Sequence, residues 1–121
     1  MKHRDISMYM MSKVILPLAL ILLPAVVRSA PVTQVQMDAV GRLADYNGVA
    51  LACRQFDEVK RIKQILIDNL PKRRELGQLF EDRTNESFVA FTGARKPCPS
   101  PAEFAEHVDE AAAALRQSFA Q

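Results

Sequence analysis

Two cysteines, Cys53 and Cys98, carry the most specific chemistry in this 121-residue chain. Two thiolates and one nearby histidine do not complete the tetrahedral ligand set of zinc. The cysteines also lie too far apart in the sequence for a Cys-x-x-Cys redox pair. The sequence therefore predicts a Cys53–Cys98 disulfide, with two free thiols as the alternative. The bridge would close a loop of about 46 residues and stabilise the fold by roughly 4 kcal/mol.

His107 is the second candidate, because Glu103 lies one helical turn before it and Glu110 nearly one turn after it. The spacing of Glu103 and His107 can place both side chains on one metal. However, His107 also borders an apolar stripe, where a half-exposed histidine paired with a glutamate is common. Since the ligand set is incomplete, we expect His107 to pack at the edge of the core, with no metal and no cofactor.

Catalytic groups are not indicated. The carboxylates of Glu81 and Asp82 point in different directions from adjacent helical positions, and no apolar surroundings would shift their pKa values. The sequence has no glycine-rich phosphate loop and no haem-attachment signature. We therefore expect that the protein is not an enzyme.

An apolar run at residues 14–27 is typical of an export signal. It is uncharged, it follows Lys13, and Arg28-Ser29-Ala30 comes directly after it. A run of this length is shorter than the roughly 20 apolar residues of a membrane-spanning helix. We predict a signal peptide over residues 1–29, with a true start at Met11 and an uncut anchor as alternatives. The mature protein would be periplasmic or secreted, without stable membrane insertion, and such compartments favour disulfides.

Removal of the leader changes the charge balance. Residues 1–29 hold four of the 16 basic and one of the 14 acidic residues, which leaves 12 and 13 for residues 30–121. The net charge of about −1 does not favour nucleic acid as a partner. Basic clusters at 60–63 and 72–74 are interspersed with acidic residues, so a solvated helix face is expected there, with an acidic partner or membrane surface as the alternative.

Residues 30–121 are predicted to form one all-α domain, because helical spacing of apolar residues recurs and strand-like alternation does not. Asn47-Gly48 could break the first helix, Asp57 is a favourable N-cap for the second, and Gly93 is a favourable end for the third. The expected helices cover about 33–54, 58–70, 72–92 and 101–119.

The segment KPCPSPAEF, residues 96–104, predicts the start of the last helix. Ser100 and Glu103 have the spacing of a capping box, and Pro101 takes the first helical position. Cys98 lies in the rigid turn just before it. The predicted disulfide would therefore tie the start of the fourth helix to the end of the first.

A binding surface is predicted at the end of the third helix. Its apolar stripe is interrupted at Arg83, Thr84 and Ser87. Apolar and basic side chains then follow beside the rigid turn, a combination that interfaces commonly use. The predicted surface consists of Phe88, Phe91, Arg95 and Lys96. In the alternative, both phenylalanines belong to the core.

The leader, the two cysteines and the proline-flanked entry to a last helix at 96–119 resemble small helical proteins of the proteobacterial periplasm. The size, helix content and cysteine spacing are similar to those of HdeA-type acid chaperones. The proline-flanked cysteine is similar to that of Tai-type immunity proteins of type VI secretion. The resemblance implies a protein-binding role and no more. From the small size, the predicted disulfide and export, and the missing catalytic groups, we predict a non-enzymatic protein-binding module with a chaperone-like, inhibitor or immunity role. A structural or accessory subunit of an envelope assembly and a carrier of small ligands or metal are the alternatives.

Overall fold

The computed structural model describes residues 30–120. The predicted signal peptide, residues 1–29, lies outside the described residues, so its prediction stays untested. Residues 31–121 form one compact unit.

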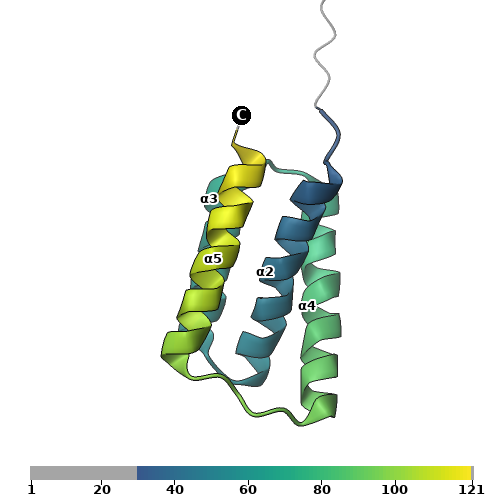
Figure 1. The fold of residues 1–121 in the computed structure, drawn as a ribbon. Coiled ribbons are helices and arrows are strands. Elements are labelled where there is room, and N and C mark those ends of the chain that lie inside the picture. Colours follow the sequence, from purple (N-terminus) through teal and green to yellow (C-terminus); the bar gives the residue numbers. More distant parts are fainter. Residues whose placement is uncertain (1–29, 121) are drawn as a thin grey trace, which may run out of the picture. The chain divides into compact units, whose positions relative to one another are not determined.

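This unit consists of helices, and no strand occurs among residues 30–120. The prediction of an all-α domain with four helices and one disulfide is confirmed. The helices are α2 (Gln34–Ala52), α3 (Phe56–Asn69), α4 (Arg74–Ala94) and α5 (Pro101–Phe119), as Figure 1 shows.

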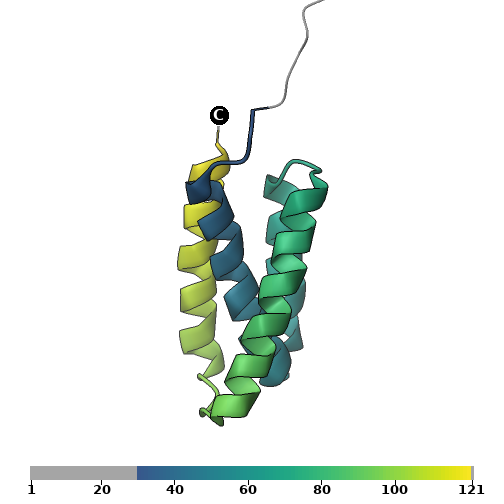
Figure 2. The ribbon, with the colours of Figure 1, turned by 90° about the vertical axis from the view of Figure 1, so that its right-hand side faces the viewer.

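Helix α2 is the centre of the arrangement, since it packs against each of the other three helices. α3 and α5 also pack against each other. No Cα atom of α4 lies within 8 Å of a Cα atom of α3 or α5, so within the described chain the close backbone packing of α4 is confined to α2. Figures 1 and 2 show α4 running along α2, on the other side of α2 from α5.

Most residues of the core belong to α2, α3 and α5, and Leu76 and Phe80 of α4 complete it. The predicted stripe of α5 faces it, and Phe104, Val108 and Leu115 are almost completely buried. Burial of such side chains is the main source of stability in a domain of this size. The fully buried partners on the other helices include Val40, Leu43, Ala44 and Ile62.

Helix α2 is continuous, so the break allowed at Asn47-Gly48 does not occur. A capping box that was not predicted from the sequence determines where this helix starts. The Thr33 hydroxyl accepts a hydrogen bond from the Gln36 backbone N–H, and the Gln36 side chain accepts one from the Thr33 N–H. The helix tolerates Gly48 because this residue packs against α4, as described below.

Two predicted helix ends were wrong. α3 begins at Phe56, with Gln55 in place of Asp57 as its N-cap. The backbone N–H of Gln55 donates to the Ala50 carbonyl oxygen, so the turn after α2 determines where α3 starts. α4 continues through Gly93 to Ala94, and Arg95 takes the left-handed conformation, with φ 56°, at its C-cap.

The start of α5 at Pro101, with Ser100 as the N-cap, is as predicted from the sequence. The Ser100 hydroxyl accepts a hydrogen bond from the Glu103 N–H, and Pro101 begins the helix. The disulfide joins Cys53 to Cys98, with Cα atoms 5.8 Å apart. The Gln55 side chain adds a hydrogen bond to the Pro99 carbonyl oxygen at 3.0 Å. The loop between α4 and α5 is therefore held to the end of α2.

Candidate functional site

The interface between α2 and α4 is unusually close. A Cβ atom placed on Gly48 would lie 2.6 Å from both the Ser87 Cβ and the Thr84 carbonyl oxygen. A glycine is required here because the backbone of α4 occupies the space of a side chain. At Gly41, an added Cβ would lie 2.7 Å from a guanidinium nitrogen of Arg83.

Polar groups hold this interface together. The Arg83 guanidinium donates two hydrogen bonds to the Asp45 carboxylate, at 2.7 and 3.2 Å. The Ser87 hydroxyl donates to the Asp45 carbonyl oxygen at 2.6 Å. The hydrogen bond to Asp45 raises the pKa of Arg83, because it stabilises the charged guanidinium.

This geometry explains the interruption in the apolar stripe of α4. We interpreted Arg83, Thr84 and Ser87 as the least regular part of the helix and inferred a free face from them. In the structure the three side chains face α2 and bind to it. The interruption therefore marks an internal polar contact, and it gives no support to a partner surface.

Asn47 lies at the centre of the interface and is 2% exposed. Its side-chain N–H donates to the Thr84 hydroxyl at 3.3 Å, and that hydroxyl donates to the Ala44 carbonyl oxygen at 3.4 Å. The amide oxygen of Asn47 is buried and accepts no hydrogen bond from residues 30–120. An acceptor buried without a donor is uncommon and requires an explanation.

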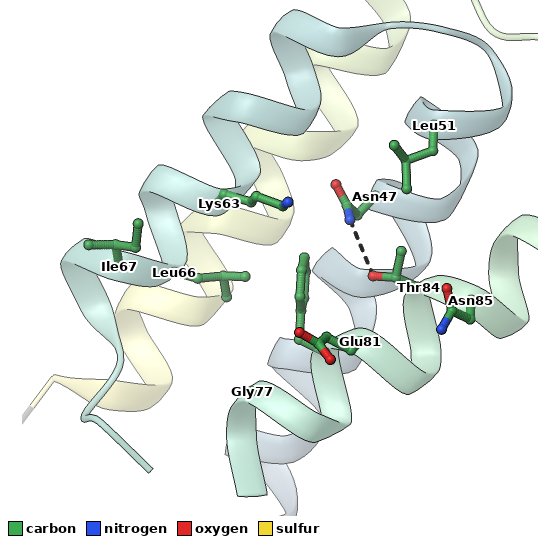
Figure 3. A pocket seen from close by; sticks show the side chains of 10 residues that line it. Asn47, Leu51, Lys63, Leu66, Ile67, Gly77, Glu81, Thr84 and Asn85 are labelled. Atoms are coloured by element: carbon green, nitrogen blue, oxygen red, sulfur yellow. Dashed lines mark hydrogen bonds between the residues drawn. The ribbon is translucent and has the colours of Figure 1, made fainter. Parts of the chain in front are cut away.

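A groove lies between α3 and α4, over this part of α2 (Figure 3). It encloses about 420 Å³. The backbones of the two walls stay apart, since no Cα atom of α3 lies within 8 Å of a Cα atom of α4. The groove is lined by Asn47 and Leu51 of α2, by Lys63, Leu66 and Ile67 of α3, and by Gly77, Phe80, Glu81, Thr84 and Asn85 of α4.

The groove combines an apolar interior with a few polar groups, as binding sites generally do. Ile67 is 73% exposed and forms part of the α3 wall. Lys63 stands on the same wall, and Glu81 on the opposite one, so the two walls carry opposite charges. The groove can therefore receive an apolar group that also makes hydrogen bonds.

The predicted surface at the end of α4 is only partly brought together. Phe91 and Lys96 line the same hollow beside α4. Arg95 is exposed at the C-cap of the helix, and Phe88 is 39% exposed one turn beyond Thr84. No contact in the structure tests whether these four residues bind a partner, so the surface stays a prediction.

His107 packs at the edge of the core. Its ring stacks on Tyr46, with ring centres 5.8 Å apart, and its Nδ1 lies 4.0 Å from the Glu110 carboxylate. Glu103 borders the same hollow as the two rings. Within residues 30–120, no three His, Cys, Asp or Glu side chains lie close enough together to hold a metal ion.

The basic cluster at 60–63 is divided between two environments. Arg61 forms ion pairs with Glu58 and with Asp109 of α5, at 3.0 and 2.7 Å. Partial burial lowers the pKa of Arg61, but the hydrogen bonds to these carboxylates outweigh it and the net shift is upward. Lys63 instead lines the groove. No helix within the described part of the chain is long and apolar enough to span a bilayer.

Neither the groove nor its central residue, Asn47, was predicted from the sequence as a binding site. We considered Asn47 only as a possible helix break. The available signal was its position, since it lies one turn from Leu43 and Leu51 on the apolar side of α2. A polar residue within such a stripe is either hydrogen-bonded inside the protein or available to a ligand. Comparison with protein-family models, curated proteins and solved structures gave no match.

Proposed function

We propose that residues 30–121 are an exported, non-enzymatic module that binds a segment of another protein in the groove between α3 and α4. One observation carries the proposal. The chain leaves open an apolar groove of about 420 Å³, with the exposed Ile67 on its wall and a buried acceptor of Asn47 at its floor.

The energetics of the groove support an occupant. An exposed isoleucine is favourably buried by an apolar partner, at about 25 cal/mol for each Å² removed from water. The two walls belong to helices held apart by their packing on α2, so little ordering would be needed on binding. A preformed groove of this kind suits an apolar face of a partner segment.

Export is proposed from two features of the chain. The leader has the basic start, apolar centre and small-residue exit of a signal peptide. The Cys53–Cys98 disulfide supports an oxidising compartment, either the periplasm or the exterior.

Site-specific photo-cross-linking in cells that export the full chain tests the proposal. A benzophenone amino acid replaces Ile67 or Asn85 in the groove, and Ala113 or Gln117 on the exposed side of α5 serves as the control. We expect a discrete adduct with another protein from the groove positions and none from the controls. Equal adducts from all four positions, no adduct, or an adduct of two copies of this chain would contradict the proposal.

The predicted surface of Phe88, Phe91, Arg95 and Lys96 makes a competing prediction. If it binds the partner, Arg95→Glu with Lys96→Glu lowers the yield of captured partner. These exposed changes should alter the free energy of unfolding by about 0.5 kcal/mol or less. If the groove binds the partner, Ile67→Glu lowers the yield and the double variant does not. The two variants decide between the surfaces.

A small apolar ligand is a second candidate, because the groove volume lies within the common range for ligand pockets of about 300–1,000 Å³. Native mass spectrometry of the purified protein separates the two candidates. A bound molecule of low mass that Ile67→Glu removes would favour a carrier.

A further inference from the structure

The Lys63 ammonium and the Asn47 amide oxygen lie at the floor of the groove, and their hydrogen-bonding capacities are complementary (Figure 3). Lys63 extends from α3 toward Asn47, whose amide oxygen is turned away from Thr84. Within residues 30–120, Lys63 forms no ion pair and the Asn47 oxygen accepts no hydrogen bond. The groove floor therefore presents one free donor and one free acceptor.

The orientation of the Asn47 amide is determined by its neighbours. The single hydroxyl proton of Thr84 points to the Ala44 carbonyl oxygen. The Thr84 oxygen must then accept from Asn47, so the amide N–H group faces Thr84 and the amide oxygen faces the groove. Exchange of the two amide atoms would leave Ala44 without this donor.

Gly77 supplies an independent observation. An alanine would be more favourable in a helix, yet Gly77 lies in the first turns of α4 and lines the groove. A Cβ atom at Gly77 would meet no other part of the described chain within 4 Å, whereas one at Gly48 would lie 2.6 Å from a backbone atom of α4. The missing side chain leaves room for the backbone of a bound segment beside α4.

We infer that the groove recognises a peptide group next to an aliphatic side chain in the bound segment; this inference rests on the proposed function. The N–H of the peptide group donates to the Asn47 amide oxygen, and its carbonyl oxygen accepts from the Lys63 ammonium. The aliphatic side chain lies on the apolar lining, which consists of Leu51, Leu66, Ile67 and Phe80. The buried oxygen of Asn47 gains the donor that it lacks in the free protein.

The test uses two small probes of nearly the same shape. The N-methylamide of 4-methylpentanoic acid carries a single peptide N–H beside an aliphatic chain, and the methyl ester of the same acid has an oxygen in its place. Each probe is titrated into the disulfide-bonded, ¹⁵N-labelled domain and followed by NMR. We expect the methylamide to shift resonances of residues 63–67 and 77–85 and to bind at least about tenfold more tightly than the ester.

Variants assign the two hydrogen bonds. Lys63→Met keeps the length of an exposed side chain and should weaken methylamide binding about tenfold without affecting the fold. Lys60→Met, an exposed lysine of α3 outside the groove lining, should leave it unchanged. Asn47→Leu should remove the preference for the methylamide over the ester. If this variant does not fold, the two lysine variants still decide the outcome.

Equal affinity of the two probes, no shifts at the groove, or the same effect from both lysine variants would overturn the inference. The cross-linking experiment does not depend on these probes. A captured partner together with indifferent probes would therefore reject peptide-group recognition and retain the proposed function.

Discussion

Helix α2 forms two interfaces that differ in nearly every physical respect. Toward α3 and α5 it contributes Val40, Leu43 and other apolar side chains that are fully buried. Toward α4 it contributes Gly48, where the two backbones come close together, and Asp45, which forms directional polar contacts. The first interface is stabilised mainly by burial of apolar surface, whereas α4 combines the burial of Leu76 and Phe80 with close backbone contact and hydrogen bonds to α2.

The difference explains where the groove lies. A helix held by apolar side chains on several neighbours fills the space between them, as α5 does against α2 and α3. A helix held by close backbone contact to one neighbour leaves its other sides open. Because α4 belongs to the second kind, its side toward α3 stays accessible, and the proposed binding site lies there.

Removal of Phe104 from the apolar interface should have the largest effect. Phe104→Ala leaves a cavity at a residue that is 1% exposed, so we expect a loss of about 3–5 kcal/mol in the free energy of unfolding. Urea denaturation followed by circular dichroism measures this loss. Phe88→Ala, at a partly exposed position of α4, is the matched control and should lose clearly less. Equal losses of unfolding free energy in the two variants would contradict the difference between the apolar core and the exposed part of α4.

Removal of the disulfide should come next. Cys53→Ser with Cys98→Ser releases the loop after α4 from the end of α2, and we expect a loss of about 2–4 kcal/mol. Hydrogen exchange sharpens the prediction, because the close backbone packing of α4 is confined to α2. Its amides should lose more protection than those of α5. An equal loss of amide protection in all four helices would contradict the expectation that α4 is the least stable helix.

Gly48→Ala tests the close contact between the two backbones. The added Cβ meets backbone atoms of α4 that cannot move independently, so we expect a loss of about 1–3 kcal/mol. Gly77→Ala is the matched control, since its Cβ meets nothing within 4 Å, and it should be neutral or stabilise by up to about 1 kcal/mol. Thermal unfolding of both variants measures the contrast. Destabilisation by both would show that helix propensity does not decide the outcome at position 77.

The Arg83–Asp45 ion pair should contribute least. Both side chains are partly exposed, so solvent screening should limit their coupling energy to about 1 kcal/mol or less. A double-mutant cycle with Arg83→Ala and Asp45→Ala measures the coupling. It should decrease in high salt. A coupling that is large and independent of salt would mean that electrostatics, rather than backbone contact, holds α4.

The features predicted well from the sequence are those determined locally. The start of α5 depends on Ser100, Pro101 and Glu103, which are neighbours in the chain, and the structure places it as expected. The disulfide followed from there being two cysteines. The predicted start of α3 was wrong because the hydrogen bond from Gln55 to Ala50 in the turn after α2 determines it. The predicted end of α4 was wrong because Arg95, and not Gly93, terminates the helix in the left-handed conformation.

The groove could not be predicted in the same way. It exists because α3 and α4 both pack on α2 while their backbones stay apart, which depends on the packing of three helices. The residues that produce this arrangement, Gly48 and Ser87, are individually compatible with a loop or a solvated face. Only their juxtaposition shows that they form one contact.

The Cys53–Cys98 bond has a further consequence for proteolysis. The turn between α3 and α4, Pro71 to Arg73, lies inside the ring of chain that the disulfide closes, and Lys72 is exposed. A tryptic cut after Lys72 would divide the domain into two peptides, each with one cysteine. They would migrate as one species on a non-reducing gel and as two after reduction. The two walls of the groove would thus remain covalently connected after a nick.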